Sequence, residues 1–384
     1  MSSFLATEKG TVRKKWTGRL PVALIYPNTY PLAVSNLGFQ LVYTLLNEQD
    51  DLVCERFVYP AASEPLRSLE SNRPLTDFPL VLGSVSFEED YPRLVALLAA
   101  GGVEPVAASR SDTISPGSPL VILGGVAVFM NPEPLASFAD LMVIGEAEPV
   151  LPKLIDGIGL LLVRGASRRE IAHHVAGTLA GCYAPALYSF RFAPDGRVLG
   201  MEHEAGAPAR VRRTAVTEVT VAAHSQLLSP EAELGMFMTE LGRGCSRGCR
   251  FCAAGFIYRP PRLWSEDQVL EGVRARPEGF ARIGLLGMEM AEARVLDRIA
   301  GYLAENSCQL SFSSLRADRI SGTVLELLAS SRLKSAAIAP DGASQRLRRV
   351  INKGLDEEDL IGAGVSLVAA GIVNLKLYVM IGLP

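Results

Sequence analysis

Short apolar runs alternate with amphipathic segments along the first part of the 384-residue chain. Runs that predict β-strands occupy residues 22–27, 52–60, 80–87, 120–125 and 141–146, and helical patterns such as 37–47 and 91–100 lie between them. Apolar strands separated by helices are typical of a parallel sheet covered on both faces. We therefore expect an α/β, doubly wound, flavodoxin-like domain over residues 20–157, with any ligand at the carboxyl ends of its strands.

The next segment, residues 158–234, loses this alternation. Asp195 and Gly196 stand between the strand-like runs YSFRF and RVLGME, which predicts a β-hairpin. A short basic run, residues 210–213, is interpreted as a solvated strand face rather than an RNA site, because charge runs usually lie at the surface. We expect a small connector that is β-rich in its second half.

From about residue 235 the alternation returns and predicts a β/α barrel. Strands are expected at 236–241, 282–287, 309–314, 334–340 and 373–382, and helices at 266–274, 291–306, 323–330, 344–351 and 357–370. The chemistry of such a barrel lies at the carboxyl ends of its strands. Five strands are too few to close it, so residues 235–384 predict a partial barrel, and we expect that a C-terminal portion is missing.

Composition narrows the class of protein. The formal net charge is −3, so there is no overall basic field for coating nucleic acid, although a local basic patch stays open. The N-terminus carries basic residues without a following apolar core, and no apolar run approaches the roughly 18 residues of a membrane span. We expect a cytoplasmic protein with no membrane partner.

The six cysteines form two groups. Three are far apart and are interpreted as buried, small apolar residues: Cys54, Cys182 and Cys308. The others fall within eight residues in the order C-x3-C-x2-C, directly after the first predicted barrel strand: Cys245, Cys249 and Cys252. Such crowding in a chain without a signal peptide indicates metal ligation.

Three thiolates on one loop can hold three irons of a [4Fe–4S] cubane and leave the fourth iron without a protein ligand. That open iron suits the amino and carboxylate groups of S-adenosylmethionine (SAM). The alternatives are a zinc site, which needs a fourth ligand, and a plain electron-transfer cluster. No histidine pair lies nearby, and Cys308 is expected at the opposite end of its strand, so the cubane is favoured.

The string that runs from Cys245 to Cys252, CSRGCRFC, resembles the signature of the radical SAM superfamily. Three longer strings resemble a group within it that carries a cobalamin-binding-like domain ahead of the radical core. They are GRGCSRGCRFCAAGFIYRPPR (242–262), APDGASQRLRRVINKG (339–354) and KLYVMIGLP (376–384). The resemblance covers the chain from about residue 20 to its end.

The resemblance implies further cofactor-binding positions, one in the cysteine loop and the others near the ends of barrel strands. The cofactor's adenine is expected at Phe251 and Gly382, and its amino group at Gly287, Met288 and Glu289. Its carboxylate or ribose is expected at Ser313, Ser314 and Arg316, for which a helix cap or a surface salt bridge is the alternative. Asp341 and Ser344 are expected to bind the cofactor at the end of the fourth strand. Met288 stands where the family often has glycine, and Asp341 where it usually has glutamate. Three basic residues of the second string are expected to be surface charges: Arg348, Arg349 and Lys353.

Cobalamin is disfavoured in its histidine-ligated form. A domain that supplies an axial histidine carries D-x-H-x-x-G after its first strand. If Gly38 is the last position of that motif, Ser35 replaces the histidine and Ala33 the aspartate. Cobalamin bound without a protein ligand stays open, as does a purely structural or substrate-binding domain.

The resemblance implies a radical enzyme. SAM is expected to be cleaved reductively, with a reductant such as flavodoxin or ferredoxin, and the 5′-deoxyadenosyl radical to attack an unknown substrate. One alternative is methyl or methylthio transfer to RNA or another macromolecule. The methylthio version is weaker, because it requires a second cluster and the N-terminal domain holds only Cys54. Another is a non-catalytic iron–sulfur scaffold, if the barrel is truly incomplete.

Overall fold

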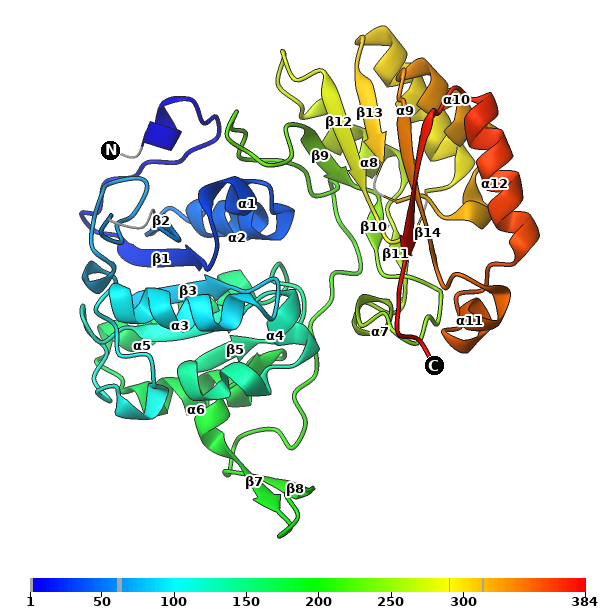
Figure 1. Cartoon of the computed structure of the whole chain (residues 1–384). Coiled ribbons are helices and arrows are strands. Elements are labelled where there is room, and N and C mark those ends of the chain that lie inside the picture. Colours follow the sequence, from blue (N-terminus) through cyan, green and yellow to red (C-terminus); the bar gives the residue numbers. More distant parts are fainter. Residues whose placement is uncertain (1–2, 61–63, 290, 313) are drawn as a thin grey trace. The chain divides into compact units, whose positions relative to one another are not determined.

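The computed structural model describes residues 3–60, 64–289, 291–312 and 314–384, which form two compact units (Figure 1). Unit 1 comprises Met1–Val216 and Gln226–Leu234, and unit 2 comprises Thr217–Ser225 and Gly235–Pro384. Each unit is built around its own sheet structure and is described by itself. Among the described residues, no helix combines the length and the apolar character that crossing a membrane requires.

Unit 1 contains a six-stranded sheet in the order β2-β1-β3-β4-β5-β6. The strands are β1 (Leu20–Tyr26), β2 (Leu52–Val58), β3 (Leu80–Ser84), β4 (Leu120–Gly124), β5 (Leu141–Val143) and β6 (Cys182–Tyr183). Neighbouring strands are parallel except β6, which is antiparallel to β5. The prediction of an α/β fold with a parallel sheet is confirmed, and the order 2-1-3-4-5 is that of flavodoxin-like sheets.

Helices cover both faces of this sheet. Alternate residues of β1 point to opposite faces, so Val22 and Leu24 pack into one core while Ala23 and Ile25 pack into the other. The first core receives α1 (Tyr30–Val34), α2 (Leu37–Asn47), α5 (Leu151–Val163) and α6 (Arg168–Thr178). The second receives α3 (Asp90–Ala100) and α4 (Val126–Met130). Short 3-10 helices occur at Ser3–Ala6, Leu75–Asp77, Ala107–Ser109, Glu133–Phe138 and Pro185–Leu187.

The segment expected to be a connector contributes to unit 1. Its β6 is the edge strand of the sheet and its α6 packs on the sheet, while β7 (Tyr188–Phe192) and β8 (Val198–His203) form the predicted antiparallel hairpin. Gly196 turns the hairpin with a φ of 82°. Of the basic run, Arg210 and Arg212 are exposed as expected, but they lie in a loop instead of a strand.

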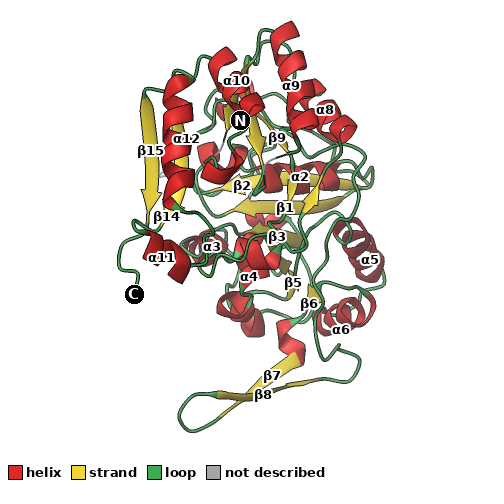
Figure 2. Ribbon diagram, turned by 90° about the vertical axis from the view of Figure 1, so that its right-hand side faces the viewer, coloured by secondary structure: helices red, strands yellow, loops and turns green. Residues whose placement is uncertain are grey.

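Unit 2 contains the five predicted barrel strands (Figures 1 and 2). Parallel strands β9 (Phe237–Glu240), β12 (Arg282–Leu286) and β13 (Gln309–Phe312) form one sheet, and β14 (Ser335–Asp341) and β15 (Asn374–Val379) form a parallel pair. A parallel bridge between Leu315 and Ile338 joins the two groups. All six residues of β15 are exposed.

The helices of unit 2 follow the prediction within two residues at each end. They are α8 (Glu266–Arg274), α9 (Ala293–Glu305), α10 (Gly322–Ser330), α11 (Gln345–Val350) and α12 (Glu357–Ala369). Shorter elements are β10 (Gly242–Arg243), β11 (Arg262–Leu263), α7 (Ala254–Ile257) and a 3-10 helix at Ala317–Arg319. β10 precedes the three-cysteine loop and β11 follows it, and the two strands pair in antiparallel fashion. This pairing holds the two ends of the loop together.

Candidate functional site

The cysteine loop follows β9 and is shaped by glycine. Gly244 has a φ of 90°, and a Cβ atom there would lie 2.3 Å from the carbonyl oxygen of Tyr258. Only glycine fits such a close approach in a left-handed conformation. The loop therefore turns back on itself directly before Cys245, at the carboxyl end of the first barrel strand.

Backbone N–H groups face two of the three sulfur atoms. The N–H of Arg247 donates to Cys245 Sγ over 3.4 Å, and that of Gly255 donates to Cys252 Sγ over 3.3 Å. Donors of this kind favour the thiolate form that iron requires. Cys249 is buried. The loop thus offers three sulfur ligands, two of them already in contact with donors.

The pKa of Cys245 is set by burial and by the groups near the thiol. Burial raises this pKa, the Arg247 N–H lowers it, and Glu289, Cys249 and Cys252 raise it further. Within the part of the chain that the structure describes, no three His, Cys, Asp or Glu side chains converge on a point that could hold a single metal ion. A [4Fe–4S] cluster makes a different demand, because each cysteine binds a separate iron.

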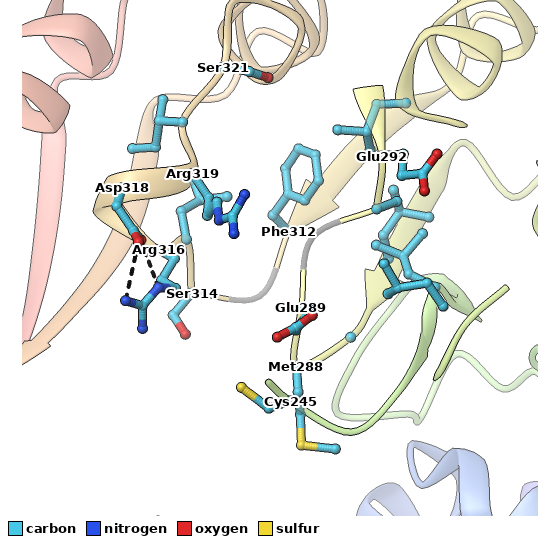
Figure 3. A pocket seen from close by; sticks show the side chains of 18 of the residues that line it. Cys245, Met288, Glu289, Glu292, Phe312, Ser314, Arg316, Asp318, Arg319 and Ser321 are labelled. Carbon is cyan, nitrogen blue, oxygen red and sulfur yellow. Dashed lines mark hydrogen bonds and ion pairs between the residues drawn. The ribbon is translucent and has the colours of Figure 1, made fainter. Parts of the chain in front are cut away.

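A cavity of about 490 Å³ lies beside the loop (Figure 3). Its wall is formed by the carboxyl ends of β12 and β13, as expected for a β/α barrel. The structure brings six of the predicted site residues together there: Cys245, Gly287, Met288, Glu289, Ser314 and Arg316. Ser313, predicted beside them, lies outside the described residues.

Glu289 links the end of β12 to the cysteine loop. Its Oε1 accepts a hydrogen bond from the N–H of Ser246 over 2.5 Å and another from the Ser246 hydroxyl. Burial alone would raise the pKa of Glu289, but the two Ser246 donors, with Arg247 and Arg319, hold it below the ordinary value. Glu289 is therefore an ionised acceptor at the edge of the cavity.

Charged residues after β13 complete the wall. Arg316 donates from Nε to Asp318 Oδ1 over 2.7 Å, and Arg247 of the cysteine loop donates to Asp318 Oδ2 over 2.9 Å. Arg319 also lines the cavity. Asp318 and Arg319 were not predicted as site residues, although their charges directly follow the predicted Arg316.

Two predicted cluster ligands, Cys249 and Cys252, do not line this cavity. Four predicted SAM contacts also do not line it: Phe251, Asp341, Ser344 and Gly382. Phe251 is 44% exposed, and Ser344 caps α11 by accepting from the N–H of Leu347. Asp341 forms an ion pair with Lys353. Gly382 is exposed, with a φ of 79° and no atom near its missing side chain. Their cofactor contacts stay predictions.

Some expectations about single residues are wrong. Arg348 is not a surface charge: it is 3% exposed, and its guanidinium donates to the carbonyls of Leu355 and Gly342. Lys353 is not a free surface charge either, because it forms an ion pair with Asp341. Arg349 is exposed as expected. Two of the scattered cysteines, Cys54 and Cys182, are buried, but Cys308 is only half-buried because it precedes β13 at the end of the strand layer.

Two family models match the chain. The model described as "Radical SAM proteins, N-terminal" matches residues 38–185, and that described as "Radical SAM superfamily" matches residues 239–384. The first covers strands β2 to β6 of the unit 1 sheet. The second begins in β9 and includes the cysteine loop and the cavity wall.

A relative and two solved structures are also similar. "Uncharacterized protein MJ0966" of Methanocaldococcus jannaschii is 26% identical over 373 residues, which cover 94% of this chain and 70% of the relative. The cobalamin-dependent SAM radical enzyme OxsB, solved with aqua-cobalamin and SAM bound, has a TM-score of 0.58 at 17% identity. That match covers 94% of this chain and 49% of OxsB, so the chain spans about half the length of that protein.

The radical SAM methyltransferase TsrM from Kitasatospora setae, with cobalamin and a [4Fe–4S] cluster bound, has a TM-score of 0.59 at 14% identity. The match covers 95% of this chain and 70% of TsrM. At these identities the likeness to both structures concerns the fold.

Proposed function

Because the chain belongs to the radical SAM superfamily, an enzyme class, we propose that Cys245, Cys249 and Cys252 hold a [4Fe–4S] cluster with which it cleaves SAM reductively. The observation that carries the proposal is the meeting of the three-cysteine loop with the cavity at the ends of β12 and β13. When bound, the cluster supplies the electron that breaks a carbon–sulfur bond of SAM and yields the 5′-deoxyadenosyl radical.

The residues of the cavity would bind and orient SAM. The ionised Glu289 can accept hydrogen bonds from the N–H groups of the amino group, and Arg319 offers a positive charge to the carboxylate. Ser314 supplies a hydroxyl for the carboxylate or ribose. Arg316 is paired with Asp318, so we assign it a structural role in the cavity wall. Phe251, Asp341, Ser344 and Gly382 remain proposed contacts on the adenine and ribose side.

Anaerobic reconstitution with iron and sulfide tests this proposal. We expect about four irons per chain, an EPR signal on reduction that changes when SAM is added, and formation of 5′-deoxyadenosine under strong reductant. Replacing the three loop cysteines by alanine should abolish all three observations, whereas Cys308→Ala should leave them intact. A loaded cluster that cleaves no SAM would leave only the iron–sulfur scaffold alternative.

For unit 1 we propose a cobalamin-binding-like module over residues 20–157 that supplies no histidine ligand. Ser35, at the position of the absent histidine, accepts a hydrogen bond from the N–H of Leu234 over 3.0 Å, and the carbonyl of Pro31 accepts from Glu233. This loop is thus held by the chain itself. Tyr26, Asn36 and Ser86 form a polar group at the ends of β1 and β3, where ligands of such sheets bind.

Methyl transfer is the second candidate, supported by the fold shared with cobalamin-containing OxsB and the methyltransferase TsrM. RNA or another macromolecule is the acceptor proposed from the sequence. Incubation with hydroxocobalamin and removal of the free corrin tests it. A retained corrin spectrum without the features of histidine ligation, together with S-adenosylhomocysteine as a product, would support methyl transfer. A colourless protein that still forms 5′-deoxyadenosine would restrict the chain to the first reaction.

A further inference from the structure

The last residue of α11, Val350, and the turn that follows it, residues 351–354, contact the cysteine loop through three hydrogen bonds. Arg250 donates its backbone N–H to the carbonyl of Ile351 over 2.9 Å and its Nη1 to that of Val350 over 2.5 Å. In the other direction, Asn352 donates its Nδ2 to the carbonyl of Gly248 over 2.8 Å. These contacts fall on the stretch between Cys245 and Cys252, which holds the three sulfur atoms.

The local sequence fixes this contact from both sides. Asn352 has a φ of 55°, a conformation that asparagine tolerates better than most residues. A Cβ atom at Gly248 would lie 3.1 Å from Asn352 Nδ2, so glycine lets the amide approach. The buried Arg348 holds the turn by donating to the carbonyls of Gly342 and Leu355. Arg348 therefore anchors the chain at Leu355, directly after the turn.

The same turn reaches the wall of the cavity. Arg316 donates from Nη2 to the carbonyls of Lys353 and Gly354, over 3.1 and 3.3 Å, while its Nε binds Asp318. Lys353 forms the ion pair with Asp341, and its Nζ lies 5.8 Å from the centre of the Phe251 ring, between the second and third cysteines. In Figure 1, α7 and α11 both lie at the lower end of unit 2.

We propose that Asn352 is a positioning residue for the cluster loop: its amide holds the Gly248 carbonyl so that the three thiols keep the spacing a [4Fe–4S] cluster needs. The inference rests on the proposed function, because the cluster is the ligand assigned there. Asn352 itself touches no sulfur and acts through the backbone of the loop. Without its hydrogen bond, the loop between the first two cysteines opens more often.

Two substitutions isolate this hydrogen bond. Asn352→Asp keeps the size of the side chain and its tolerance of positive φ, but replaces the donor by a carboxylate that faces a carbonyl oxygen. Asn352→Gly keeps the backbone conformation and removes the side chain. Arg349→Ala is the matched control, because Arg349 lies in α11, three residues before Asn352, and is exposed.

Hydrogen exchange in the cluster-free 384-residue chain measures how often the backbone of the cysteine loop opens. In both Asn352 variants the Arg250 amide, which is bonded to Ile351, should exchange about five-fold faster, the effect of losing one ordinary hydrogen bond. Amides within α11 should keep their protection, which shows that the helix remains folded. The Arg349→Ala variant should match the wild type.

The reconstituted chain gives the second measurement. Both Asn352 variants should lose iron to a chelator several-fold faster than wild type and show a broadened EPR signal of the reduced cluster. Unchanged exchange at Arg250 overturns the inference, and so does faster exchange with unchanged iron loss. If wild-type protein takes up no cluster at all, the proposed function fails, while the exchange measurement still decides whether Asn352 holds the loop.

Discussion

At Arg56, in the edge strand β2, a guanidinium is enclosed by two carboxylates. Arg56 lies 2.6 Å from Glu8 and 2.6 Å from Glu70, and all three side chains are almost fully buried. Burial raises the pKa of Glu70, whereas at Glu8 the two bonds from Arg56, with Thr11 and Tyr30, outweigh burial and lower the pKa. The cluster ties the N-terminal segment over the open edge of the sheet.

Glu8 should therefore stabilise unit 1 in a pH-dependent way. Its folded pKa is below the ordinary value of 4.5, so its contribution is present above about pH 4.5 and is lost as the pH falls through the lower folded pKa. Glu8→Gln should cost about 1.5–3 kcal/mol at pH 7, because charge-assisted hydrogen bonds are lost. The difference from wild type should shrink below pH 4.5.

Denaturant unfolding at a series of pH values measures this difference. Glu204→Gln is the control, because Glu204 makes an ion pair with Arg169 at the surface, where such pairs contribute less than about 1 kcal/mol. A gap between Glu8→Gln and wild type that stays constant down to pH 3 would show that Glu8 is not the titrating group.

At the scale of elements, the apolar and amphipathic patterns of unit 2 reproduce the five strands and five helices within a few residues. The prediction of these elements is accurate because each helix or strand buries one face. The spacing of apolar side chains along its own sequence shows which face is buried. The loops differ. The conformation of the cysteine loop depends on the close approach of Gly244 to the carbonyl of Tyr258. The local sequence pattern does not predict this contact.

A pair of glycine substitutions tests this difference. Gly244→Ala should cause a several-fold loss of bound iron, since it adds a Cβ atom 2.3 Å from the Tyr258 carbonyl at a φ of 90°. Gly301→Ala, within α9, meets no atom within 4 Å and should stabilise the chain by about 0.5–1 kcal/mol with unchanged iron. Iron analysis and thermal unfolding separate the two, and equal iron content in both variants would contradict the role given to Gly244.

At the scale of the whole molecule, the chain leaves unit 1 at Val216 and returns to it at Gln226–Leu234 before it continues into unit 2. The returning segment is fastened by Gln40, whose buried Oε1 accepts the N–H groups of Gln226 and Leu227 over 2.7 and 2.8 Å. The sequence alone assigns residues 158–234 to one connector. Its local pattern does not indicate that the chain returns to unit 1 at residues 226–234.

Gln40→Met tests the return. Methionine fills the same volume but removes the acceptor for two N–H groups and the donor to the Val34 carbonyl. We expect a loss of about 1–3 kcal/mol per buried group left unsatisfied and faster hydrogen exchange at residues 226–228. Unchanged exchange in that segment would show that Gln40 does not hold it.

By itself, the sequence determined the parallel α/β sheet, the barrel strands and the three-cysteine loop. Periodic burial and close ligand spacing are local properties, and local properties can be read along a chain. Only the tertiary structure decided which distant groups meet: Glu289 with Ser246, Asp318 with Arg247, and Asn352 with Gly248. Each pair joins segments at least 43 positions apart, so its contact depends on how the strands pack and not on the sequence around either residue.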